Sequence, residues 1–95
     1  MTALLIGNVG PVADHEGMAA YRERVGRILE AHGGRFVIRG GEFTVLEGAW
    51  WPTHLSVMEF PTADHARRWY TSPEYRELLS LREGTPMDLV LVEGP

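Results

Sequence analysis

The chain has 95 residues, is 44% hydrophobic and carries a formal net charge of −4, which indicates one globular domain with a thin core. It contains no cysteine and no lysine, which excludes disulfides, thiolate nucleophiles, cysteine-ligated zinc and Schiff bases on a side-chain amine. No basic face is visible, so we expect no nucleic-acid partner. With no signal peptide and no apolar segment of membrane-spanning length, we expect no membrane partner and a cytoplasmic location.

The first third of the sequence predicts a strand followed by a helix. Residues 3–7 form a compact apolar run that is typical of a short buried strand. Asp14 is the expected N-cap of a helix, and Gly33 with Gly34 ends it. The apolar face of this helix recurs at helical spacing and consists of Met18, Tyr21, Val25, Ile28 and Leu29.

The middle of the sequence predicts two strands and a long connection. Residues 35–39 alternate as a strand does, and the pair Gly40-Gly41 then interrupts the pattern. Because residues 42–47 resume an extended pattern, we interpret the glycine pair as a bulge or bend inside the strand rather than as its end. Residues 48–54 form a connection, and residues 55–60 form the next strand.

The last third predicts a broken helix and a final strand. Thr62 is the expected N-cap, and Gly84 stops the helix. Between them, Ser72 is a good N-cap and Pro73 a good first helical residue, so the helix should end and restart at this corner. Residues 87–93 form the last strand.

This order of elements predicts a single α+β domain, residues 1–95, with a ferredoxin-like βαββαβ sandwich. Two right-handed crossovers around a central hairpin give an antiparallel sheet with two helices on one face. The strands are apolar at consecutive positions, although helices can cover only one face of the sheet. We therefore predict a homodimer in which a second copy covers the open sheet face and the two sheets form a shared barrel.

The chain resembles domain-of-unknown-function family 1330, which is part of the dimeric α+β barrel superfamily. The matching residues extend over nearly the whole length and include Tyr21-Arg22, Gly33-Gly34-Arg35-Phe36, Arg39-Gly40-Gly41, Val45-Leu46-Glu47-Gly48, Glu59-Phe60-Pro61, Trp69-Tyr70, Ser72-Pro73-Glu74-Tyr75 and Leu91-Val92-Glu93-Gly94. One departure is Met18, where the family commonly has a tyrosine. The resemblance implies the dimeric fold and a relationship to small cofactor-free oxygenases and isomerases, but no settled reaction.

Arg39 and Glu59 are the first candidate binding residues. Each ends an otherwise apolar strand, and the two strands should be hairpin neighbours. A buried arginine and a buried carboxylate would pair, because neither is tolerated alone. In the functional interpretation, Arg39 anchors an anionic ligand such as a carboxylate and Glu59 holds it in place. In the structural interpretation, which is the more common outcome, the two form an ion pair only.

The aromatic residues at the helix corner are the second group of candidates. Tyr70 and Tyr75 could line a cleft between the second helix and the sheet, where a phenol offers a hydrogen bond to a ligand oxygen. Alternatively, large aromatic side chains at helical spacing fill the core. We expect Trp69 and Tyr75 to belong to the core and Tyr70 to be the ring that can face a ligand.

His32 and Trp50 complete the candidates. No metal-ligand spacing is present, so we expect no metal and no cofactor. Surface positions are the default for the histidines, and His32 or His54 could serve a site assembled across the fold; as a base we would choose His32. The adjacent Trp50 and Trp51 lie on a connection and point opposite ways, which indicates a dimer contact or a pocket rim.

Two functional hypotheses follow from the sequence. The first is a small-molecule binding protein, which could be a cofactor-free enzyme acting on a small anionic or aromatic organic compound. The second is a non-catalytic dimeric module that binds a ligand or a partner protein. A cavity that holds convergent polar groups would favour the first, and a closed apolar core would favour the second.

Overall fold

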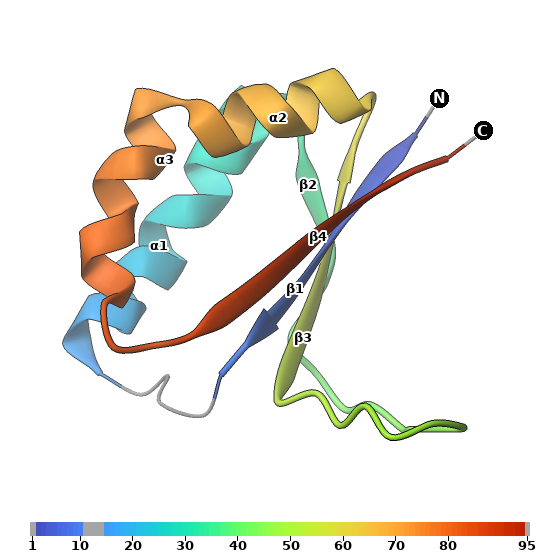
Figure 1. Cartoon of the computed structure of the whole chain (residues 1–95). Helices are drawn as coiled ribbons and strands as arrows, with labels where there is room; N and C mark the ends of the chain where they lie inside the picture. The colour runs from blue at the N-terminus through green and yellow to red at the C-terminus, as the bar shows by residue number, and fades with distance from the viewer. Residues whose placement is uncertain (1, 11–14, 95) are drawn as a thin grey trace.

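A computed structural model of the chain describes residues 2–10 and 15–94. The elements in chain order are β1 (Ala3–Val9), α1 (Glu16–Ala31), β2 (Arg35–Arg39), β3 (His54–Phe60), α2 (Ala63–Thr71), α3 (Pro73–Leu78), the 3-10 helix η1 (Leu79–Arg82) and β4 (Met87–Glu93). The four strands form one antiparallel sheet in the order β2-β3-β1-β4. All the helices lie on one side of this sheet (Figure 1). The predicted ferredoxin-like fold is confirmed.

The two faces of the sheet differ in what covers them. On β1, burial alternates, so Leu5 and Gly7 lie toward the helices whereas Leu4 and Ile6 lie on the open face. The helix-facing side chains pack with α1, α2 and α3 into one core, whose fully buried large members are Met18, Leu29, Phe60, Trp69 and Tyr75. The core therefore occupies only the space between the sheet and the helices.

Side-chain caps fix where the helices begin. His15 caps α1, its Nδ1 accepting from the Met18 amide at 3.3 Å; the predicted cap Asp14 lies outside the described residues. The Thr62 cap of α2 is confirmed. The corner at Ser72 is also confirmed, because α2 ends at Thr71 and Pro73 is the first residue of α3.

Residues 40–53, which we call the arm, differ from the sequence prediction. β2 ends at Arg39, and Gly40 and Gly41 follow with φ of 68° and 143°. The glycine pair therefore ends the strand, and the bulge in the ladder lies earlier, between Phe36 and Ile38. The extended pattern of residues 42–47 forms no strand in the structure. Apolar alternation alone was misleading here, because a strand also needs a neighbour to pair with.

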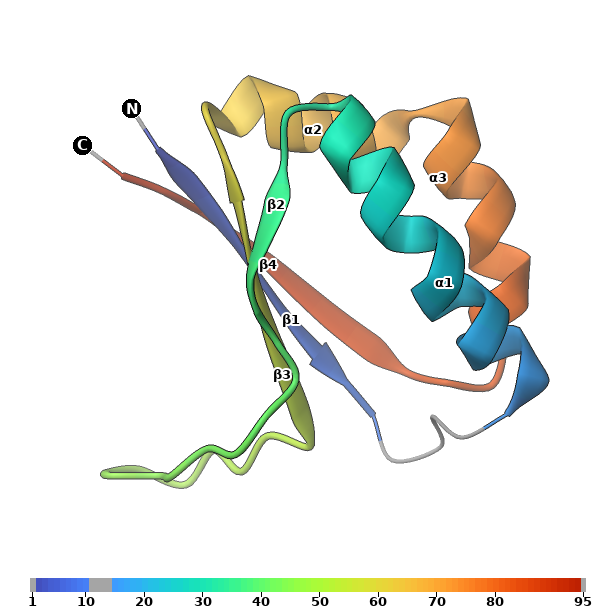
Figure 2. The ribbon, with the colours of Figure 1, turned by 180° about the vertical axis from the view of Figure 1, so that it is seen from behind.

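The arm projects past the sheet on the side away from the helices, as both ribbon views show (Figures 1 and 2). Its end is fastened to β1, because Asn8 Oδ1 accepts from the backbone amides of Thr53 and His54 at 2.8 and 3.1 Å. Beyond this anchor the arm exposes its large apolar side chains. Leu46 is 92% exposed and Trp51 is 75% exposed, although the Trp51 ring has an edge-to-face contact with Phe43.

The open face of the sheet is apolar and uncovered. Ile38 on β2 and Val90 on β4 are 54% and 56% exposed, and Val92 is 44% exposed. Exposed branched side chains on the outer face of a sheet are the pattern that led to the dimer prediction. None of the helices in the described part of the chain has the length and apolarity needed to cross a membrane.

Candidate functional site

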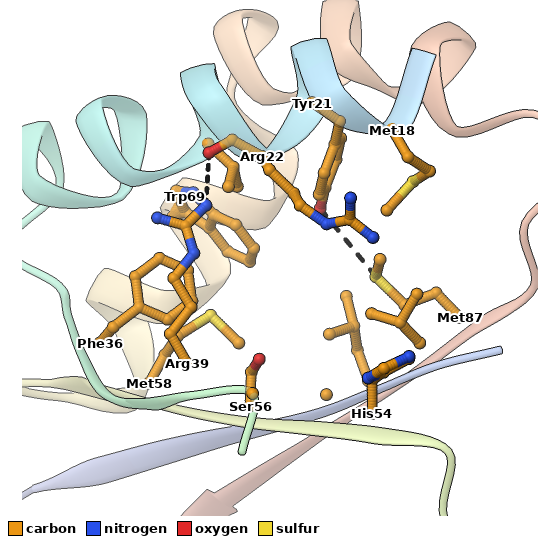
Figure 3. Close-up of a pocket in the computed structure, with 15 residues that line it drawn as sticks. Met18, Tyr21, Arg22, Phe36, Arg39, His54, Ser56, Met58, Trp69 and Met87 are labelled. Atoms are coloured by element: carbon orange, nitrogen blue, oxygen red, sulfur yellow. Dashed lines mark hydrogen bonds between the residues drawn. The ribbon is translucent and has the colours of Figure 1, made fainter. Parts of the chain in front are cut away.

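A cavity of about 280 Å³ lies between α1 and the helix-facing side of the sheet (Figure 3). Its floor includes Gly7 on β1 and Ser56 on β3, which are partners in the ladder. Because neither residue carries a large side chain, the core leaves a gap over this pair. The wall is mostly apolar and includes Met18, Val25, Phe36, Met58, Met87 and Leu89.

Arg39 lies at the side of this cavity, where β2 ends. Its guanidinium is 4.4 Å from the centre of the Phe36 ring, and its Nη2 donates to the backbone carbonyl of Arg22 on α1 (Figure 3). The guanidinium also lies near Gly26 of α1, where a Cβ would be 3.4 Å from Arg39 Nη1. No carboxylate in the described part of the chain forms an ion pair with Arg39, so its charge is not neutralised by the protein.

A pair of phenols lies beside the cavity. Tyr21 reaches into it from α1 (Figure 3), and its hydroxyl oxygen is 2.8 Å from that of Tyr75 on α3. Tyr75 is fully buried, with its ring 4.2 Å from that of Trp69 between centroids. Burial is the main cause that raises the pKa of the Tyr21 hydroxyl above its usual range, and the neighbouring Tyr75 adds to it. Tyr21 is therefore neutral at physiological pH.

Three further polar groups belong to the cavity lining. His54 and Ser56 point into it from β3 (Figure 3). Trp69, which is almost fully buried, also lines it, and its Nε1 is a buried donor without a hydrogen-bond partner in the described structure. An unsatisfied buried donor costs about 1–3 kcal/mol. A ligand acceptor that bonded to Trp69 Nε1 would remove this cost.

The electrostatic character of the lining is positive. Two of the lining residues, Arg22 and Arg39, carry guanidinium groups, whereas no aspartate or glutamate appears among the described residues that line the cavity. The chain as a whole is acidic, with a net charge of −4, so this local excess of positive charge runs against the composition. The arrangement favours an organic anion whose body is apolar.

The predicted ion pair between Arg39 and Glu59 is wrong. Both residues lie at or near the carboxyl ends of their strands. Because β2 and β3 are antiparallel, these two strand ends lie at opposite ends of the hairpin. Glu59 is instead the ladder partner of Arg35, which contacts it through Nε at 2.9 Å and Nη2 at 2.6 Å. Glu59 does not line the cavity, so of the predicted pair the structure leaves only Arg39 at the site.

The other predicted binding residues lie outside this cavity. Tyr70 is 39% exposed, with its ring against the guanidinium of Arg76 at 4.4 Å, rather than facing a cleft. Tyr75 is in the core, as expected, where it contacts Tyr21 and Trp69, and both of these line the cavity. His32 follows the end of α1, with its Nδ1 3.0 Å from the carbonyl oxygen of Ile28, and Trp50 is on the arm.

Sequence reasoning missed Tyr21 and Ser56 as site residues, whereas His54 had been named as a residue that could serve a site assembled across the fold. Tyr21 was assigned to the apolar face of α1, which is correct but does not reveal that a cavity lies beside it. A usable signal was available on the strands, where Gly7 and Ser56 are small residues at helix-facing positions. Such a gap on one face of a strand indicates space above the sheet.

The fold and the cavity together define the class of this protein: a small ferredoxin-like α+β protein with a positively charged, mostly apolar cavity between sheet and helices. Within this class the chain belongs to a family of domains of unknown function, DUF1330, which matches residues 2–95. The resemblance stated from the sequence is confirmed. No curated protein matches the chain.

Solved structures agree on the fold. The chain is similar to a protein of unknown function from Rhodopseudomonas palustris, at 21% identity and a TM-score of 0.73, over 99% of this chain and 82% of that one. It is also similar to a dimeric ferredoxin-like protein of unknown function from Bacteroides fragilis, at 14% identity and a TM-score of 0.55, over 98% and 96% of the two chains. A third, from Thermobifida fusca, is likewise dimeric and ferredoxin-like, at 14% identity, a TM-score of 0.52 and coverage of 99% and 92%.

Proposed function

We propose that this protein binds a small organic carboxylate in the cavity between α1 and the sheet, with the carboxylate against Arg39. The observation that carries the proposal is the guanidinium of Arg39 at the side of an apolar cavity, stacked on Phe36 and without a carboxylate partner in the described chain. An arginine presents paired donors that match a carboxylate in two parallel hydrogen bonds. The sequence-based hypothesis of an anion anchor at Arg39 thus gains geometric support, without Glu59.

The size and lining of the cavity limit the ligand further. A volume of about 280 Å³ is at the small end of the range for ligand sites, so the ligand is a small metabolite rather than a nucleotide or a peptide. The methionines that line the cavity, among them Met18, Met58 and Met87, are flexible and polarizable, and they adapt to flat or branched apolar groups. An aromatic or short aliphatic acid fits these properties.

We also propose that the protein acts as a homodimer through the open face of its sheet. The support is the exposed apolar face around Ile38 and Val90, together with the arm, which extends on that same side with Leu46, Trp50 and Trp51 exposed. Exposed apolar surface of this kind marks a protein contact. Two similar structures are dimers. A cytoplasmic location and the absence of a nucleic-acid partner stay predictions from the sequence.

A ligand screen by thermal shift tests the binding proposal, followed by calorimetric titration of the acids that stabilise the protein. The variant is Arg39→Gln, which removes the charge and keeps most of the side chain. Hydrogen bonds to charged groups contribute about 1.5–3 kcal/mol, so we expect Kd to rise about tenfold to a hundredfold.

Arg35→Gln is the matched control, because Arg35 begins the same strand and pairs with Glu59 away from the cavity. It should leave Kd within twofold of the wild type, since an exposed pair contributes only about 0–1 kcal/mol, and that to folding rather than to binding. If both variants bind the acids as wild type does, or if no small acid binds the wild type at all, the proposal is wrong.

A further inference from the structure

We propose that Tyr21 is a second recognition group of the cavity, one that donates a hydrogen bond to an uncharged oxygen of the ligand. The ligand class is then an oxo acid, meaning a carboxylate that also carries a carbonyl oxygen at a distance from it. This inference rests on the proposed function, because Arg39 is taken to hold the carboxylate end. It adds which second functional group the site selects and which residue selects it.

The phenol pair contains two hydroxyl protons, and each needs an acceptor. Tyr21 and Tyr75 have one hydroxyl proton each, and one hydrogen bond of 2.8 Å joins the two oxygens. As a donor, the Tyr75 hydroxyl has no acceptor among the described residues other than Tyr21. The Tyr21 hydroxyl has a second possible acceptor, Met87 Sδ, at 4.0 Å. Both protons are used only if Tyr75 donates to Tyr21 and Tyr21 donates onward.

In the unliganded chain, the acceptor for the Tyr21 proton is the sulfur of Met87. A thioether sulfur is a weak acceptor, and 4.0 Å is a long contact for it. Met87 lines the cavity together with Tyr21, so the Tyr21 proton is directed along the cavity wall (Figure 3). Because Tyr75 donates to Tyr21, the Tyr21 hydroxyl is polarised into a stronger donor. A carbonyl oxygen is a much better acceptor than the sulfur that it would replace.

The two polar groups, Arg39 and Tyr21, are placed differently in the cavity. Arg39 lies beside Phe36 and Met58, whereas Tyr21 lies toward Met18 and Met87, so they occupy different parts of the cavity (Figure 3). A ligand that binds Arg39 through its carboxylate would contact Tyr21 with a second oxygen. The Tyr21 hydroxyl is neutral, so it keeps a proton to donate to a ligand oxygen and does not act as a base.

The test is a calorimetric comparison of matched acids. The probes are a series of straight-chain and phenyl-substituted oxo acids, with the carbonyl at increasing distance from the carboxylate, each paired with the acid in which a methylene replaces the carbonyl. A neutral hydrogen bond changes affinity by about threefold to tenfold, so wild type should prefer at least one oxo acid over its methylene partner by that factor. Tyr21→Phe should remove this preference and leave the affinity for the methylene acid unchanged.

Two further variants keep the test independent of folding defects. The double variant Tyr21→Phe with Tyr75→Phe removes both hydroxyls, so neither phenol is left buried and unpaired, and it should also lack the preference. Tyr70→Phe makes the same chemical change at a phenol outside the cavity and should keep it.

The outcomes separate this inference from the proposed function. Equal binding of oxo and methylene acids by wild type, or a preference that survives Tyr21→Phe, would overturn the role of Tyr21 while binding that depends on Arg39 stands. Failure of every acid to bind wild type would overturn both.

Discussion

Tyr75 connects the core of the protein to its cavity through a single hydroxyl. Its ring packs against Trp69 in the fully buried interior, and its oxygen reaches Tyr21 at 2.8 Å. A polar atom left unpaired at this depth costs about 1–3 kcal/mol. The pair therefore ties the position of the Tyr21 donor to the packing of α3 against α1.

This coupling predicts an unusual order of stabilities. Tyr21→Phe leaves the Tyr75 hydroxyl buried without its partner, which should lower the free energy of unfolding by about 1–3 kcal/mol. The double variant Tyr21→Phe with Tyr75→Phe removes both polar groups at nearly constant shape, so it should be more stable than the single Tyr21→Phe variant. Urea denaturation of the three proteins measures this order. Additive losses in the double variant would contradict the hydrogen bond between the two phenols.

At the scale of elements, the corner between α2 and α3 positions the aromatic residues of the core. The Ser72 hydroxyl donates to the Trp69 carbonyl at 2.7 Å and accepts from the Tyr75 amide at 3.2 Å. One buried side chain thus ends one helix and begins the next. Trp69 lines the cavity and Tyr75 supports its Tyr21 donor, so the geometry of this corner reaches the site.

We expect Ser72→Ala to lower the free energy of unfolding by about 1–2 kcal/mol, because the loss of an N-cap side chain has that cost. Ser80→Ala is the matched control, since the exposed Ser80 makes only a long contact of 3.5 Å to the Glu77 carbonyl, and it should change stability by less than about 0.5 kcal/mol. Thermal unfolding of the two variants gives the comparison. Equal losses would show that the corner does not depend on the cap.

Local signals in the sequence predicted the elements better than they predicted the site. The caps at Thr62 and Ser72 depend on neighbours a few residues away, and both are confirmed. The continuation of β2 into the arm was wrong because a strand needs a partner, which a single segment does not reveal. The pairing of Arg39 with Glu59 was wrong because strand ends had been compared without the direction of the strands.

The site depends on positions that lack a large side chain, and residue types alone do not show that such positions meet. The cavity lies over Gly7 and Ser56, which are partners in the ladder, and Arg39 reaches α1 beside it. Each of these has an ordinary explanation in its own segment. Only the register of β1 on β3, together with the position of α1, brings them to one place, so among the lining residues the sequence pointed only to Arg39 and His54.

At the scale of the whole molecule, the sheet has one covered and one uncovered face. The helices bury one face, while Ile38, Val90 and Val92 stay exposed on the other and the arm projects beyond it. A domain of this size buries a limited fraction of its surface on folding, so covering this face would add substantially to its stability. The proposed dimer gives both the open face and the arm a partner.

Val90→Glu tests this dimer, because it places a charge on the open face, at the edge strand β4. We expect wild type to be a dimer in light scattering at micromolar concentration and Val90→Glu to be a monomer, since a buried unpaired charge is strongly unfavourable. Ala19→Glu, at an exposed position on α1, should remain dimeric. A monomeric wild type would contradict the proposed assembly.

The binding site that we propose for a small organic carboxylate is the cavity between α1 and the sheet. An NMR titration that follows the backbone amides of the wild-type protein, with the acid that stabilises it most, tests this claim directly. We expect the largest chemical-shift changes at the amides of Gly7, Arg39 and Ser56, which line the cavity. Shift changes confined to the arm or to the open face around Val90 would contradict it.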